Sequence, residues 1–244
     1  MTDTQPRDDI YAAPLERVER FRFDERVAAV FPNMLRRSVP GYEVVVASLG
    51  LIAQRYVTPG STVFDLGCSH GAATAAVRAR LGGVDCRLVA VDNAPAMIER
   101  AGALLDGPTG PPVELRCVDI REVVVERASL VVLNYTLQFV PPAERLTLLR
   151  RIRDGMLPGG VLVLSEKVRG ADAHEDRVLT ELHDAFKRAN GYSDLEISQK
   201  RAALEQVLVA EALSVHLERL REAGFTAVET WFRCLNFASL LAHA

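Results

Sequence analysis

The sequence predicts an α/β fold, in which a mostly parallel sheet carries helices on both faces. Short apolar runs alternate with longer segments of helical periodicity, which is typical of strand–helix–strand units. The run at residues 63–66 ends at Gly67 and leads directly into an Ala-rich, helix-prone segment. Two apolar runs close the chain, and the link between them is too short for a helical crossover. This last pair of strands is therefore expected to be antiparallel.

Seven strands are expected in this Rossmann-like sheet. They are placed at residues 62–66, 87–91, 113–118, 130–134, 161–164, 227–232 and 235–241. Helices are expected at residues 43–57, 70–81, 97–105, 142–156, 174–188, from 193 onward and 214–223. Two helices follow the fifth strand where one would be enough for a crossover. We therefore expect a helical insertion after strand five, at about residues 171–212.

The domain itself is expected to span residues 43–244, after an irregular or helical segment at residues 1–42. The first ten or so residues are polar and suggest disorder. Aromatic residues and Arg and Glu then alternate without a clear period, and Pro32 and Pro40 interrupt them. Such a segment predicts short helices and turns. Either it packs against an edge of the domain or it closes as a lid over a ligand.

Composition excludes several classes of protein. Of the 244 residues 49% are hydrophobic, which is enough for a core, and the net charge of −3 argues against a nucleic-acid-binding surface. The four cysteines form no CxxC pair and the histidines are scattered, so neither a disulfide framework nor a metal site is expected. No signal peptide and no run long enough to span a membrane is seen. We expect a cytoplasmic protein that binds no membrane.

The turn at Gly67 allows three interpretations. It is a plain strand-to-helix turn, a hydrolase nucleophile elbow or a cradle for a nucleoside-bearing cofactor. Residues 67–71 do fit G-x-S-x-G, but they follow the first strand of the sheet and no HGGG-like segment precedes them, which disfavours the hydrolase. Small residues at such a turn let backbone N–H groups approach a ligand, beside the positive end of the next helix.

Polar residues at the carboxyl ends of three further strands favour the cofactor. Asp92 is placed to accept from two ribose hydroxyls, and Asp119 from an adenine amino group. The second acid favours S-adenosylmethionine over NAD. Asn134 would lie beside the sulfonium, although capping of the following turn also explains it. No Pro-Pro-Tyr or Pro-Cys follows, so signatures of amino-group and cytosine-carbon methyltransferases are absent.

Arg201 occupies an unusual position in the predicted insertion. It falls on one helical stripe with Ile197, Leu204 and Leu208. A guanidinium in an apolar stripe needs an anionic partner, because an unpaired buried charge is very costly. The partner is either a carboxylate of the protein, in a buried salt bridge, or a carboxylate of a ligand.

Several longer motifs resemble the bacterial carboxy-S-adenosyl-L-methionine synthases, a family with the class I methyltransferase fold. The resemblance runs from about residue 20 to the end. Its motifs lie at residues 30–34, 37–42, 65–69, 90–93, 137–139, 164–167, 186–193 and 196–201. The stretches at 37–42 and 186–201 are the most specific. The chain departs from the family pattern at Asn33, at Tyr135 and in the Pro/Gly-rich loop at 107–112.

The resemblance implies conversion of S-adenosylmethionine and prephenate to carboxy-S-adenosylmethionine and phenylpyruvate, for modification of the wobble uridine of tRNA. It also implies a homodimer, which apolar stripes on the insertion helices favour. No general base stands out. The resemblance places ligand contacts at Tyr42, Gly67, Cys68, Ser69, Asp92, Asn93, Asp119, Ile120, Asn134 and Arg201. An ordinary methyltransferase and a non-catalytic tRNA-binding module remain the alternatives.

Overall fold

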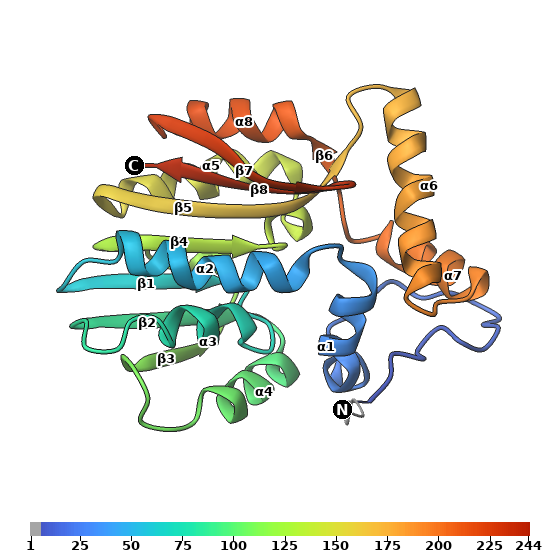
Figure 1. Ribbon diagram of the computed structural model, residues 1–244, viewed down its shortest axis with the longest axis horizontal. Helices are drawn as coiled ribbons and strands as arrows, with labels where there is room; N and C mark the ends of the chain where they lie inside the picture. Colours follow the sequence, from blue (N-terminus) through green and yellow to red (C-terminus); the bar gives the residue numbers. More distant parts are fainter. Residues whose placement is uncertain (1–5) are drawn as a thin grey trace.

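Seven strands of the protein form one continuous twisted sheet in the order β3-β2-β1-β4-β5-β8-β7 (Figure 1). The structure is a computed structural model and describes residues 6–244. Strands β1 to β5 are parallel, and β8 is antiparallel to both β5 and β7, as predicted. A two-residue strand, β6, pairs with the end of β5 off this path. The strands are β1 Ser61–Leu66, β2 Cys86–Asp92, β3 Val113–Cys117, β4 Ala128–Asn134, β5 Met156–Arg169, β6 Glu211–Ala212, β7 Ala227–Cys234 and β8 Phe237–His243.

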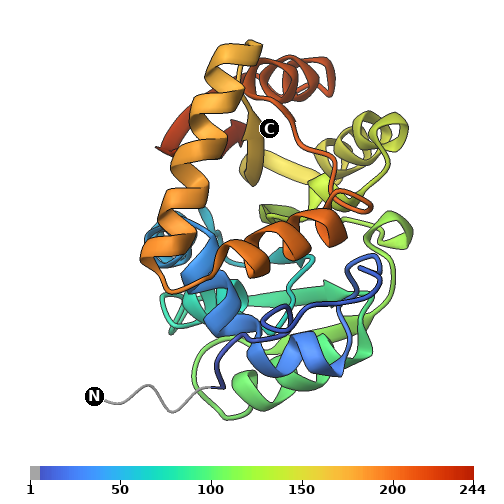
Figure 2. The ribbon, with the colours of Figure 1, turned by 90° about the vertical axis from the view of Figure 1, so that its right-hand side faces the viewer.

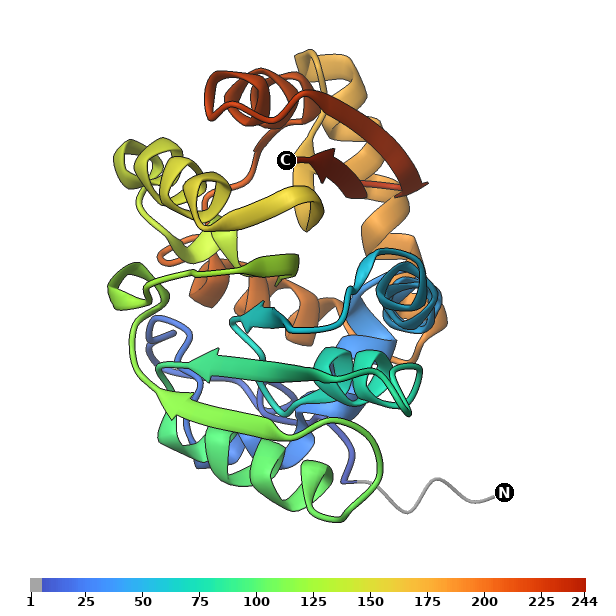
Figure 3. The same cartoon turned by 90° about the vertical axis from the view of Figure 1, so that its left-hand side faces the viewer.

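Helices cover both faces of the sheet (Figure 3). Helices α2 and α3 pack on one face and α5 and α8 on the other, each pair with its own apolar cluster. Every residue of β1 is buried, as expected of a central strand covered on both sides. The helices are α1 Glu25–Ser38, α2 Tyr42–Tyr56, α3 Ala72–Arg78, α4 Pro95–Leu105, α5 Pro142–Asp154, α6 Ala173–Ala189, α7 Asp194–Leu204 and α8 Leu213–Glu222, with short 3-10 turns η1 Ile120–Glu122 and η2 Leu137–Phe139.

The N-terminal segment and the insertion meet beyond the carboxyl ends of the strands. Helices α1, α6 and α7 lie side by side there, together with the chain that precedes α1 (Figures 1 and 2). Phe21, Phe31 and Met34 form a third apolar cluster with Met97 of α4 and Ala203 of α7. The predicted insertion after strand five is thus confirmed as the pair α6 and α7. Within residues 6–244, no helix has the length and apolar character needed to cross a membrane.

Several predicted boundaries were wrong. Residues 25–38 form one 14-residue helix rather than short helices and turns, although Pro32 lies inside it. A proline removes one backbone donor, and here the packing of Val27, Phe31 and Met34 against the apolar cluster outweighs that loss. Strand β5 already begins at Met156, which the apolar stripe had assigned to the preceding helix.

The start of the chain is also more ordered than predicted. Residues 1–5 lie outside the described residues, but from residue 6 onward the chain follows a defined course. Asp8 is 1% exposed, and its backbone carbonyl accepts a hydrogen bond from Arg37 Nη1 at 2.8 Å. Tyr192 donates a hydrogen bond to its carboxylate. Disorder is therefore the wrong description for the part of this segment that the structure describes.

Candidate ligand-binding site

A pocket of about 820 Å³ opens at the carboxyl ends of the parallel strands, beneath α1, α6 and α7. Crevices at this edge of α/β sheets are the usual ligand sites, and the volume lies in the upper part of the range of about 300–1,000 Å³ that small-molecule sites occupy. All ten predicted site residues line it. They are Tyr42, Gly67, Cys68, Ser69, Asp92, Asn93, Asp119, Ile120, Asn134 and Arg201.

The turn after β1 forms the floor of this pocket, and Gly67 is held in it by both conformation and space. Its φ is 87°, in the left-handed region, and a Cβ at this position would lie 2.3 Å from the side chain of Thr136. The amides of Gly67 and Cys68 both donate to the carbonyl of Val91 at 2.8 Å. Ser69 follows with a φ of 52°. These bonds fix the turn against the end of β2.

The two acids at the strand tips differ in their surroundings. Asp92 accepts hydrogen bonds from the amides of Ser69 and Ala94, both at 2.9 Å, and burial raises the pKa of its carboxyl. Asp119 accepts from the backbone and the guanidinium of Arg121, which lowers the pKa of its carboxyl. Both acids are therefore oriented by hydrogen bonds, and Asp92 is the less solvated of the two.

A third acid, Asp65, lies beneath the turn, where it is buried and does not itself line the pocket. It is 4% exposed, and Thr74 Oγ1 donates to its Oδ2 at 2.5 Å. Burial raises its pKa to about 6, and its Oδ1 has no hydrogen-bond partner among residues 6–244. No lysine or arginine of this described part forms an ion pair with Asp65 or Asp92. In the sequence, Asp65 stands out as an acid inside an apolar strand run. The two carboxylates of Asp65 and Asp92 together favour a ligand with positive charge nearby.

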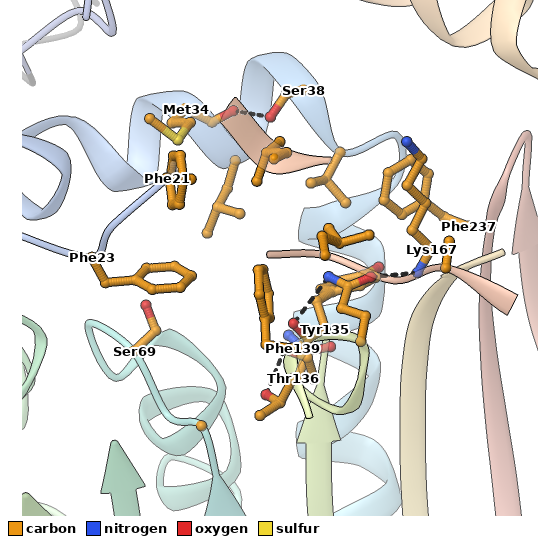
Figure 4. A pocket seen from close by; sticks show the side chains of 18 of the residues that line it. Phe21, Phe23, Met34, Ser38, Ser69, Tyr135, Thr136, Phe139, Lys167 and Phe237 are labelled. Atoms are coloured by element: carbon orange, nitrogen blue, oxygen red, sulfur yellow. Dashed lines mark hydrogen bonds between the residues drawn. The ribbon is translucent and has the colours of Figure 1, made fainter. Parts of the chain in front are cut away.

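Aromatic side chains form the walls (Figure 4). Tyr135, with a φ of 61°, lies between Tyr42 and Phe237, with ring centroids 6.3 and 5.9 Å away. Burial raises the pKa of both tyrosines. Phe23, which precedes α1, packs against Phe139 at 5.3 Å. The segment before the domain thus contributes a wall of the pocket, as a lid would.

The hydrogen-bonding groups of β4 and η2 are only partly used. Asn134 Oδ1 and the Tyr135 hydroxyl are buried, and neither has a partner within residues 6–244. Buried polar atoms normally have partners, so these two are available to a ligand. Asn134 is the last residue of β4. It is expected from the sequence to lie beside the sulfonium of S-adenosylmethionine.

Arg201 lines the pocket but is not buried in an apolar stripe. Its side chain is 43% exposed and forms an ion pair with Asp184 of α6. The buried face of α7 instead includes Ile197, Lys200 and Ala203, and α7 ends at Leu204, before Leu208. The stripe was therefore wrong by one position around the helix. The prediction that Arg201 is buried is therefore also wrong. The acidic partner that was expected for it is present, as Asp184.

Other basic residues near Arg201 were missed by the sequence analysis. Lys167, Lys187 and Lys200 all line the pocket, as does His183. Lys187 Nζ lies 2.9 Å from Asp184 Oδ1. His183 Nε2 donates to the carbonyl of Ser38 at 2.8 Å, and burial lowers the pKa of its imidazole to about 3, so it is neutral at physiological pH. These residues are far apart in the sequence, and no spacing brings them together.

No group of His, Cys, Asp and Glu side chains in the described part of the chain is arranged to hold a metal ion. The pocket presents acids at the carboxyl ends of β2 and β3, unpaired polar atoms at the end of β4, and basic groups on β5, α6 and α7. This distribution of charge suits a cationic ligand at the acidic end of the pocket and a neighbouring anion at the basic end.

Comparisons with known proteins identify the family. A model described as "Methyltransferase domain" matches residues 63–160. Carboxy-S-adenosyl-L-methionine synthases from Trichlorobacter lovleyi and Klebsiella pneumoniae are 57% and 50% identical to the chain. The alignments cover 98% and 97% of this chain and 99% and 96% of the relatives.

Solved structures agree on the fold. The S-adenosylmethionine-dependent methyltransferase SibL matches with a TM-score of 0.64 and 19% identity, over 94% of this chain and 63% of its own. Human N-acetylserotonin methyltransferase, solved in complex with SAM, matches with a TM-score of 0.56 and 17% identity, over 96% of this chain and 60% of its own. The chain therefore belongs to the carboxy-S-adenosyl-L-methionine synthases, a family of transferases with the class I methyltransferase fold.

Proposed function

We propose that the protein converts S-adenosylmethionine and prephenate to carboxy-S-adenosylmethionine and phenylpyruvate. The observation that carries this proposal is the division of one pocket into an acidic end, at Asp92 and Asp119, and a basic end, at Lys167 and Arg201. S-adenosylmethionine has a sulfonium and an amino group, and prephenate is a dicarboxylate. A pocket that places opposite charges at its two ends can hold them side by side.

Nine of the ten predicted residues would hold S-adenosylmethionine, and the tenth, Arg201, would bind the carboxylate of the product. The backbone of the turn at Gly67, Cys68 and Ser69 borders the methionine part, and Asp92 accepts from the ribose hydroxyls. Asn93 and Ile120 border the nucleoside, and Asp119 accepts from the adenine amino group. Asn134 and Tyr42 remain for the neighbourhood of the sulfonium. The unpaired Oδ1 atom of Asn134 supports this assignment, because it lines the pocket and can face positive charge.

The methyl group is then a source of a carbanion instead of a group to be transferred. A methyl next to a positive sulfonium is acidic, and its loss of a proton gives an ylide. Prephenate loses its ring carboxylate as carbon dioxide and its ring hydroxyl as hydroxide, which leaves phenylpyruvate. The hydroxide accepts the methyl proton and becomes water, and the ylide carbon bonds to carbon dioxide. This balance needs no protein base.

Such intermediates must be kept from bulk water. The aromatic side chains before and within α1, including Phe23 and Phe31, cover the pocket and support this role. The new carboxylate needs a cation. We infer that Arg201 binds it, by exchanging its ion pair with Asp184 for a charge-assisted bond to the product.

The wider setting also remains a proposal. We infer that the product supplies a separate enzyme that modifies the wobble uridine of tRNA, in the cytoplasm, and that this chain itself binds no tRNA.

We also infer a homodimer. Val178 and Leu182 support it, because they are exposed apolar side chains one turn apart on α6. A monomer in light scattering at micromolar concentration would exclude the dimer.

Incubation with both substrates tests the reaction. The purified chain with S-adenosylmethionine and prephenate should yield phenylpyruvate and, by mass spectrometry, a nucleoside heavier by one carboxylate. Omitting prephenate is the matched control and should give neither product. Formation of S-adenosylhomocysteine with a methylated acceptor would instead make the chain an ordinary methyltransferase.

A further inference from the structure

Among the described residues, Lys167 and Arg169 are basic residues of the pocket that form no ion pair, and Lys167 is the less exposed of the two. Lys187 and Arg201 both pair with Asp184. No hydrogen bond or ion pair to the Lys167 ammonium is found among residues 6–244. Burial lowers the pKa of Lys167 and the nearby Lys187 and Arg201 lower it further, while Asp184 and Asp176 act in the opposite direction. Asp184 already pairs with Lys187 and Arg201, so a partly desolvated ammonium without a direct partner points to an anion from outside the chain.

The position of Lys167 is fixed by its backbone. It lies on β5 opposite Phe237 of β8, and its amide donates to Gln138 Oε1 at 3.1 Å. Gln138 in turn donates through Nε2 to the carbonyl of Tyr135 at 3.1 Å. Lys167 is thus held at a set place beside the aromatic wall, on a strand rather than on a loop.

The surroundings of Lys167 describe the anion that would suit it. Figure 4 shows Ser69 at one end of the pocket and Lys167 at the other, with Tyr135 and Phe139 between them. Tyr135 and Phe237 form an aromatic surface that lines the same pocket, and Phe237 is the cross-strand neighbour of Lys167. The occupant should therefore combine a flat six-membered ring with a carboxylate, at the end of the pocket away from the turn at Gly67.

We propose that Lys167 binds the side-chain carboxylate of prephenate, the one that phenylpyruvate retains, while the ring lies against Tyr135 and Phe237. This inference rests on the proposed function. The choice between the two carboxylates follows from charge. The ring carboxylate must lose its negative charge as carbon dioxide forms, so a cation paired with it would stabilise the bound substrate more than the transition state. The side-chain carboxylate keeps its charge throughout, and a cation there binds substrate and transition state alike.

Uniform binding of this kind has a kinetic signature. The variant Lys167→Met should raise KM for prephenate about 10- to 100-fold, the range for loss of a charge-assisted hydrogen bond, and leave kcat and KM for S-adenosylmethionine nearly unchanged. Phenylpyruvate should lose inhibitory strength by the same factor, because it carries the same carboxylate. Lys167→Arg should recover part of the affinity for prephenate and part of the inhibition by phenylpyruvate. Arg150→Met, an exposed cation on α5 paired with Glu222, is the control and should behave as wild type.

Thermal unfolding separates binding from structure. Lys167→Met should unfold no earlier than wild type without ligand, because it removes an unpaired charge, but it should lose the stabilisation that phenylpyruvate gives in the presence of S-adenosylmethionine. An unchanged prephenate KM, or a lower unfolding temperature with an unchanged KM, would overturn the inference. A raised prephenate KM with unchanged phenylpyruvate inhibition would assign Lys167 to the ring carboxylate instead. A wild-type chain that makes no carboxy-S-adenosylmethionine would refute the proposed function, and the phenylpyruvate shift would still test Lys167.

Discussion

Asp184 of α6 forms an ion pair with Arg201 of α7 at the rim of the pocket. The same carboxylate lies 2.9 Å from Lys187 Nζ. One acid thus holds two cations in the ligand-free protein. A carboxylate that enters the pocket competes with Asp184 for Arg201, and this competition would let the protein distinguish a carboxylated ligand from S-adenosylmethionine.

Replacement of Arg201 tests that distinction. Arg201→Met should leave the Kd for S-adenosylmethionine within about twofold and raise the Kd for carboxy-S-adenosylmethionine about 10- to 100-fold, as expected for a hydrogen bond to a charged group. Isothermal titration with both ligands measures the two constants. An equal loss for both would show that Arg201 has no specific part in binding the carboxylate.

The ion pair between Asp8 and Lys200 ties the start of the chain to α7. Their charged atoms are 3.2 Å apart, and the two side chains are 1% and 8% exposed. Asp8→Asn leaves the ammonium buried without a counter-ion and should lower the free energy of unfolding by about 3–5 kcal/mol. The double variant Asp8→Asn/Lys200→Met should recover much of this loss in denaturant titrations. If the single and double variants were equally unstable, the ion pair would not be the cause.

Glu166 should make stability depend on pH. It is buried, accepts a hydrogen bond from the Leu137 amide at 2.9 Å, and has a pKa raised by burial to about 8. The unfolded chain releases this proton near the ordinary value of 4.5, so its contribution to stability is lost as pH rises toward about 8. Glu166→Gln should remove this slope and be the more stable form at pH 9, by more than about 1 kcal/mol. Parallel stability profiles of the two proteins between about pH 5 and 9 would contradict this.

Gly67→Ala should damage both the fold and the site. The new Cβ would lie 2.3 Å from Thr136, at a φ of 87° that L side chains rarely adopt. We expect a loss of about 2–4 kcal/mol from overpacking and backbone strain together, and no measurable binding of S-adenosylmethionine. Adding Thr136→Ala should recover little, because the Thr136 Cβ alone is 2.8 Å from the new atom. Full recovery would show that the turn tolerates a side chain. Calorimetry measures both the loss of stability and the loss of S-adenosylmethionine binding.

The central strands β1 and β4 could be predicted because they are buried on both faces and carry unbroken apolar runs. Local signals also sufficed for the Gly67 turn and for the capping box that begins α7 at Ser193. Helix α1 could not be predicted, because its stability comes from contacts of Phe31 and Met34 with distant parts of the chain, which outweigh Pro32.

The polar residues at strand ends, Asp92, Asp119 and Asn134, followed from topology, whereas Tyr42, Cys68, Asn93 and Ile120 came from the family resemblance. All ten predicted site residues line one pocket. The basic side was not predictable in the same way. Lys167, Lys187 and Arg201 come from a strand and two helices that only the tertiary fold brings together. Periodicity also misplaced Arg201, because a stripe drawn through Leu208 continued a helix that ends at Leu204.

The central claim is that the methyl group of S-adenosylmethionine loses a proton and gains a carboxylate. The most direct measurement uses S-adenosylmethionine with a fully deuterated methyl group, incubated with the protein and prephenate and followed by mass spectrometry. We predict carboxy-S-adenosylmethionine that retains two of the three deuterium atoms, with the third released to water. S-adenosylhomocysteine together with an acceptor that carries all three deuterium atoms would contradict the account.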